Sequence, residues 1–117
     1  FVAWQHEIEG NANVGFIDAN TGKLQWQKKL APRSRRPVIG MAPNGDVQLI
    51  WVQSGRLTTA TLGRAGVGTQ SRVARVVGNH PAVSIAPGAK RGEWYVAWQD
   101  YESGRLEPYA ARISCQQ

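Results

Sequence analysis

The chain has a single cysteine, Cys115, and only two histidines among its 117 residues. One cysteine excludes a disulfide within the chain and a zinc site built from several cysteines. A disulfide from Cys115 to a second chain is open to an exported protein, with a free thiol as the plainer alternative. Neither His6 nor His80 has a partner at a metal-binding spacing such as His-x-x-x-His. We therefore expect neither a metal nor another cofactor.

Long apolar runs and helical periodicity are also missing. No stretch of 18 apolar residues occurs, which excludes a membrane-spanning helix. No window repeats apolar residues at the i, i+3, i+4, i+7 spacing over three turns, and the 13 glycines and 6 prolines interrupt nearly every long segment. The composition, 42% hydrophobic and 19% charged, is typical of a folded globular protein. The sequence thus predicts one all-β domain.

Acidic residues are scarce, with 8 against 14 basic ones and a net charge of +6. Such an excess favours anionic partners through its long-range field. The densest group of cations lies in a segment that we expect to be a loop, and it comprises Lys28, Lys29, Arg33, Arg35 and Arg36. This segment is either a solvated linker or a docking patch for an acidic protein, a polyanion or an anionic surface. No DNA- or RNA-binding motif accompanies it, so nucleic acid is not the expected partner.

What the chain does contain is an internal repeat. Trp51 follows Trp4 by 47 residues, and Trp98 follows Trp51 by 47, each within a similar apolar segment ending in glutamine. A second match aligns Pro37–Pro43 with Pro81–Pro87 at an offset of 44. Two independent matches at similar offsets predict structural repeats of 40 to 50 residues.

The central repeat predicts a unit of four strands. A turn at Pro43-Asn44-Gly45-Asp46 closes the first hairpin, because Asn-Gly tolerates positive φ. In the second strand, Val47, Leu49 and Trp51 alternate with Gln48, Ile50 and Val52, as expected of a strand buried on both faces. The four predicted strands are Pro37–Ala42, Val47–Gln53, Arg56–Leu62 and Arg72–Val77.

The same template fits both flanks of this unit. Upstream it predicts the second, third and fourth strands at Phe1–Gln5, Val14–Ala19 and Lys23–Leu30. Downstream it predicts the first, second and third strands at Pro81–Ala86, Glu93–Gln99 and Arg105–Ile113. Short strands at this period favour a β-propeller, with a partial blade at 1–30, a full antiparallel blade at 37–78 and a partial blade at 81–113, about two and a half to three blades in all. A β-sandwich is the alternative.

Two segments resemble known propeller repeats. Asp18-Ala19-Asn20-Thr21-Gly22-Lys23, followed by Trp26, is similar to the repeat of quinoprotein-type propellers. Val96-Ala97-Trp98-Gln99-Asp100 resembles the blades of sialidase-like exported propellers. The resemblance implies a partial propeller ring in a secreted, periplasmic or cell-surface protein. The sialidase pattern Ser-x-Asp-x-Gly-x-x-Trp is absent, and too few blades are present to enclose a quinone cofactor.

From these features we expect a non-catalytic binding or scaffolding module rather than an enzyme. The missing first strand upstream and the missing fourth strand downstream are complementary, so another chain or identical copies would complete the propeller. The start at Phe1 points to processing or to a fragment. Trp4, Trp51 and Trp98 either pack between blades or form a platform for a glycan. The alternatives are a lectin-like propeller that binds carbohydrate, and a fragment of a propeller hydrolase or quinoprotein dehydrogenase.

Overall fold

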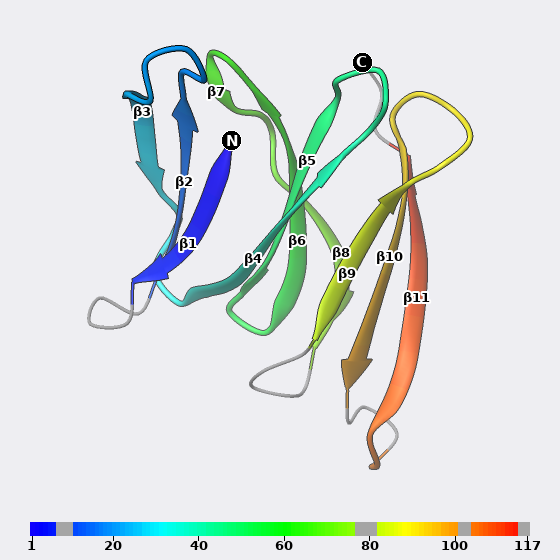
Figure 1. The fold of residues 1–117 in the computed structure, drawn as a ribbon. Coiled ribbons are helices and arrows are strands. Elements are labelled where there is room, and N and C mark those ends of the chain that lie inside the picture. The colour runs from blue at the N-terminus through cyan, green and yellow to red at the C-terminus, as the bar shows by residue number, and fades with distance from the viewer. Residues whose placement is uncertain (7–10, 77–81, 101–103, 115–117) are drawn as a thin grey trace.

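The computed structural model describes residues 1–6, 11–76, 82–100 and 104–114. Every regular element in these ranges is a β-strand, so the predicted all-β class is confirmed. The strands form three antiparallel sheets that follow one another along the chain (Figure 1). We refer to them as the first, middle and last sheets.

Eleven strands make up the three sheets within the described ranges. The first sheet contains β1 (Val2–His6), β2 (Asn11–Ile17) and β3 (Leu24–Lys29). The middle sheet contains β4 (Ser34–Met41), β5 (Val47–Gln53), β6 (Arg56–Gly63), β7 (Gly66–Val67) and β8 (Ser71–Arg75). The last sheet contains β9 (Val83–Pro87), β10 (Glu93–Asp100) and β11 (Glu107–Ser114). The sequence predicts each of these strands to within a few residues except the short β7.

Strand β5 has both faces buried because its sheet lies between the other two. Val47, Leu49 and Trp51 enter a core shared with the first sheet. Ile50 and Val52 enter a second core shared with the last sheet. Alternate residues of a strand point to opposite faces, so the predicted two-sided alternation of this segment is confirmed.

The first core joins the first and middle sheets. Phe1 stacks on Phe16 with ring centroids 5.0 Å apart, and Trp26 meets Phe16 edge-on at 6.4 Å. Trp26 also donates a hydrogen bond from Nε1 to the carbonyl of Arg64 across the interface, at 2.7 Å. The buried members are Ala12, Val14, Leu30, Val47, Leu49, Trp51, Ala60 and Leu62.

The second core joins the middle and last sheets. Trp98 stacks on Tyr109 of the neighbouring strand, with ring centroids 6.0 Å apart and planes inclined by 20°. Val83 and Ile85 of β9 pack against the same core. Its buried members are Ile50, Val52, Leu57, Val76, Val96 and Trp98.

The pairing of the proline-flanked strands corrects one detail of the predicted repeat. Ile39 pairs with Leu49 in the middle sheet, and Ile85 pairs with Val96 in the last sheet. Equivalent residues of β4 and β9 are therefore 46 apart, whereas the sequence match at 44 aligned Ile39 with Val83. A slip of two residues keeps every side chain on the same face, so the alternating pattern did not distinguish the two registers.

Gly40 allows β4 to lie directly against the last sheet. A Cβ at this position would lie 2.9 Å from Ile85 Cγ2 and 3.1 Å from the Trp94 ring. Ile85 is stiff at χ1 and Trp94 is buried, so neither can move aside without cost. We expect Gly40→Val to lower the free energy of unfolding by about 1–3 kcal/mol, measured by urea denaturation. Gly63→Val, which meets open space, is the control and should change stability by less than ~0.5 kcal/mol.

Candidate functional site

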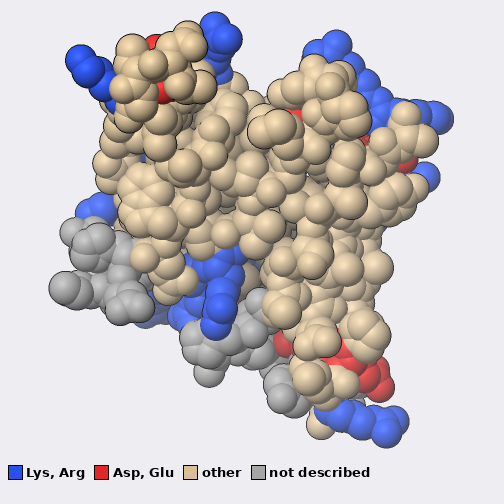
Figure 2. All heavy atoms as spheres, viewed as in Figure 1, with Lys and Arg blue, Asp and Glu red and all other residues tan. Residues whose placement is uncertain are grey.

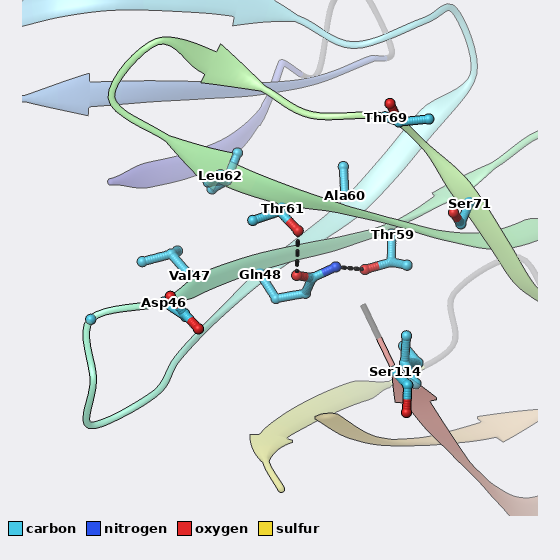
Figure 3. Close-up of a pocket in the computed structure, with 12 residues that line it drawn as sticks. Asp46, Val47, Gln48, Thr59, Ala60, Thr61, Leu62, Thr69, Ser71 and Ser114 are labelled. Atoms are coloured by element: carbon cyan, nitrogen blue, oxygen red, sulfur yellow. Dashed lines mark hydrogen bonds between the residues drawn. The ribbon is translucent and has the colours of Figure 1, made fainter. Parts of the chain in front are cut away.

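A polar hollow of about 600 Å³ opens where the middle sheet faces the end of β11 (Figure 3). Gln48 on β5 and Thr59 and Thr61 on β6 form its floor, because they share one face of the paired strands. Thr69, Ser71 and Ser114 add hydroxyl groups at its rim. The other lining residues are Gly45, Asp46, Val47, Ala60, Leu62 and Ile113.

The floor of this hollow is a closed hydrogen-bond network. Gln48, which is 1% exposed, donates from Nε2 to Thr59 Oγ1 at 2.7 Å. Thr61 donates to Gln48 Oε1 at 3.2 Å, and Thr59 donates to the Leu49 carbonyl at 2.9 Å. A buried polar group is stable when its partners are in place, and here the partners come from the two strands themselves.

The chemistry available in this hollow is limited to hydrogen bonding. Asp46 is the one ionisable residue among those that line it, and its carboxylate is engaged by Arg91 at 3.2 Å. Activating a serine or threonine hydroxyl as a nucleophile requires an adjacent base, and no histidine or lysine lines the hollow. The site can hold a small polar molecule, but its lining has no acid–base pair.

The three repeated tryptophans differ in exposure. Trp51 is 0% exposed in the first core and donates from Nε1 to Gln53 Oε1 at 3.1 Å, while Trp98 is 7% exposed in the second core. Trp51 and Trp98 thus pack in the two cores, which is one of the two alternatives given above, and their buried rings are not accessible to a ligand. Trp4 is half-buried and is the one of the three with an appreciable part of its surface free. Of the three tryptophans, only for Trp4 does glycan binding stay a prediction.

Equivalent tryptophans point in the same direction along the stack of sheets. Trp51 points from the middle sheet to the first, and Trp98 points from the last sheet to the middle. Phe1 and Ala3 pack toward the middle sheet, so Trp4, which alternates with them, points to the opposite face of the first sheet. Among the sheets that the structure describes, none covers that face.

The face that bears Trp4 is mixed, because Asn13 and Lys29 share it with exposed apolar side chains. Leu24 reaches the same side, because its Cδ1 and the Trp4 ring both lie next to Gly15. Val2 is 36% exposed and Leu24 is 48% exposed. Large side chains in such positions indicate a surface that another layer is able to cover.

The far face of the last sheet is the counterpart. Tyr95, Ala97 and Gln99 are exposed there and alternate with buried residues of β10. They follow Gln48, Ile50 and Val52 by 47 residues and occupy the equivalent face. In the middle sheet that face is covered by the next sheet along the chain.

The predicted basic patch lies where the chain passes from the first sheet to the middle one. Lys28 and Lys29 end β3, within the predicted strand Lys23–Leu30, whereas Arg35 and Arg36 were expected in a loop and belong to β4. Only Arg33 lies in the connection, with a left-handed φ of 66°. Strand pairing therefore extends farther than the charge-based prediction allowed, because β4 continues past a bulge between Arg35 and Val38.

This connection is fixed to both sheets. Arg36 donates its backbone N–H to Gln5 Oε1 at 3.2 Å, and Gln53 donates from Nε2 to the Pro32 carbonyl at 2.8 Å. Figure 2 shows Lys and Arg side chains gathered at the lower end of the molecule, between the first and middle sheets. The patch is a positively charged surface on an ordered turn.

Three arginines near this end were not singled out from the sequence. Arg56 lies on β6, and Arg72 and Arg75 lie on β8. The signal was present, because the predicted third and fourth strands of the unit would bring Arg56 beside the other two. They form no charge run, since each is separated from the next basic residue by neutral ones.

Two predicted features lie outside the described residues, namely Cys115 with its disulfide to a second chain, and His80. Within the described ranges, no three metal-ligating side chains come together. No helix there is long and apolar enough to cross a membrane. The chain matches no protein-family model, and comparisons with curated proteins and with solved structures return no match.

Proposed function

We propose that the chain is a β-propeller segment that acts as a non-catalytic binding or scaffolding module of an exported assembly. Its ring is completed by another chain or by copies of the same chain. The observation that carries this proposal is the serial stacking of three equivalent sheets, each turned the same way, with one uncovered face at each end of the stack.

The arrangement of the strands supports radial blades. Strand β4 lies beside both β1 and β9, so the sheets meet along one edge. The opposite edges of the three sheets are β3, β7 with β8, and β11, and β3 also contacts β7. A sandwich packs two sheets with strand directions roughly aligned, whereas three sheets in series around a common edge are typical of propeller blades.

The repeat also supports a partner of the same kind. The Trp51 face of the middle sheet is covered by the first sheet, and the Trp98 face of the last sheet is covered by the middle sheet. By analogy, the Trp4 face would be covered by a sheet whose exposed residues correspond to Tyr95, Ala97 and Gln99. The last sheet of a second copy carries these residues. The Trp4 face of one copy would then meet the Tyr95 face of the next, which is a head-to-tail contact.

A binding role fits the chemistry of the described hollow. Its floor is hydrogen-bonded within itself, and its one carboxylate is paired with Arg91. The positively charged surface near the β3–β4 connection favours an anionic partner, and we propose that this partner is an acidic protein or an acidic surface. Export rests on the resemblance to exported propellers.

The test is the mass of the chain in solution, measured by sedimentation equilibrium. We expect species at multiples of 12.8 kDa, in a concentration-dependent equilibrium. Trp4→Glu should weaken association more than about a hundredfold, because it buries an unpaired carboxylate. Ala65→Glu adds the same charge on an exposed turn and should leave association unchanged. A stable 12.8 kDa monomer that unfolds cooperatively would contradict the proposal.

A further inference from the structure

A second hollow, of about 450 Å³, lies where the β5–β6 turn meets β8. Its lining contains two guanidinium groups, three hydroxyl groups and two amide groups, and none of its residues is acidic. The residues are Gln53, Ser54, Arg56, Thr58, Gln70, Ser71 and Arg72. Each of these side chains carries hydrogen-bond donors, and those of Thr58 and in part of Gln53 are already used within the chain.

Strand pairing concentrates positive charge on one face at this place. Arg56 is directly opposite Arg75, and Thr58 is directly opposite Arg72. Directly opposed residues of an antiparallel pair share a face, with Cβ atoms about 4.5–5.5 Å apart. Like charges in that position repel each other, so the free chain holds an unfavourable arrangement that an anion would relieve.

Two ion pairs among the described residues involve other arginines. Elsewhere Arg91 pairs with Asp46 at 3.2 Å, and Arg105 pairs with Glu107 at 3.7 Å. Within the part of the chain that the structure describes, Arg56 and Arg72 have no carboxylate partner. Their guanidinium donors are therefore available to a ligand.

The backbone around the hollow is fixed before any ligand arrives. Ser54 and Gly55 form the two-residue turn between β5 and β6, with φ of 49° and 78°, the left-handed pair that a tight hairpin requires. Gln53 is held by the Pro32 carbonyl, and Thr58 donates to the Arg56 carbonyl at 3.2 Å. Pre-organised donors bind more tightly because less conformational freedom is lost.

We propose that this hollow binds the sulfate or phosphate group of a small hydroxylated ligand, such as a sugar ester. Arginine forks match the oxygens of such groups, and charge-assisted hydrogen bonds are about twice as strong as neutral ones. The neighbouring hydroxyl and amide groups suit the hydroxyls of the carrier. No aromatic ring lines the hollow, so it lacks the stacking surface that single-stranded nucleic acid uses.

The site is independent of the proposed assembly. Its residues lie on the strands of the middle sheet and on the connections between them, whereas the surfaces proposed to meet other copies are the Trp4 face of the first sheet and the Tyr95 face of the last. A Trp4→Glu chain should therefore still bind the ester. Failure of assembly and failure of ester binding are thus distinguishable.

The test is a calorimetric titration at low salt with glucose 6-sulfate, glucose 6-phosphate and glucose. We expect at least one ester to bind and glucose not to bind, and the two esters show which oxyanion is preferred. Arg56→Gln with Arg72→Gln should weaken ester binding at least about tenfold. The matched control, Arg64→Gln with Lys90→Gln, removes the same charge from exposed turns at the other end of the sheets and should change affinity less than about twofold.

Thermal unfolding separates binding from a merely structural role. Without ligand, the Arg56→Gln, Arg72→Gln chain should be at least as stable as the parent, because repulsion is removed. The ester should raise the melting temperature of the parent but not of this variant. The proposal is wrong if neither ester binds, if both double variants lose affinity equally, or if an oligonucleotide binds through these arginines while the esters do not compete.

Discussion

Replacing Trp51 with alanine should lower the free energy of unfolding by about 3–5 kcal/mol. Trp51 is 0% exposed and lies between the first and middle sheets, so the change leaves a cavity that the flanking strands cannot fill. A domain is typically stable by only about 5–15 kcal/mol, so much of the population should unfold at moderate temperature. Urea denaturation followed by circular dichroism measures the loss.

Two further substitutions make this prediction specific. Met41→Ala removes a large apolar side chain that is 63% exposed, and it should change stability by less than ~0.5 kcal/mol. Trp4→Ala should cost less than Trp51→Ala under conditions where the chain is monomeric, because one side of Trp4 is uncovered. A loss below ~1 kcal/mol for Trp51→Ala would show that the first and middle sheets are not packed as described.

The positions of the strands could be predicted because apolar alternation and turn residues act locally. Asn44-Gly45 and Ser54-Gly55 close hairpins through backbone geometry that the residue types alone permit. The register of β9 against β10 could not be fixed in this way, since a shift of two residues gives the same alternation. The short β7 was missed because Gly66 and Val67 are too few to form a recognisable pattern.

The candidate sites were harder to predict because they depend on which strands become neighbours. Gln48 looked like one polar exception in an apolar strand, and only its pairing with β6 places it beside two threonines. Arg56 and Arg72 are 16 residues apart in the sequence, yet both line one hollow. The basic patch, in contrast, was visible as a charge run because its members are close in sequence.

Mixing two association-defective chains should restore assembly, but only to a dimer. Trp4→Glu blocks the open face of the first sheet, and Tyr95→Glu blocks the far face of the last sheet. Each variant alone should be monomeric, because burying an unpaired carboxylate costs about 3–5 kcal/mol, more than a hundredfold in affinity. In an equimolar mixture, the intact Tyr95 face of one variant meets the intact Trp4 face of the other.

The mass of that mixture distinguishes the symmetry of the contact. A head-to-tail contact gives a species of twice 12.8 kDa and nothing larger, since both remaining faces carry the added glutamate. If identical faces met about a two-fold axis, one variant would dimerise by itself and mixing would add nothing. Sedimentation equilibrium resolves these cases. Self-association of either variant would contradict the head-to-tail contact, and with it the idea that the three sheets continue into a ring.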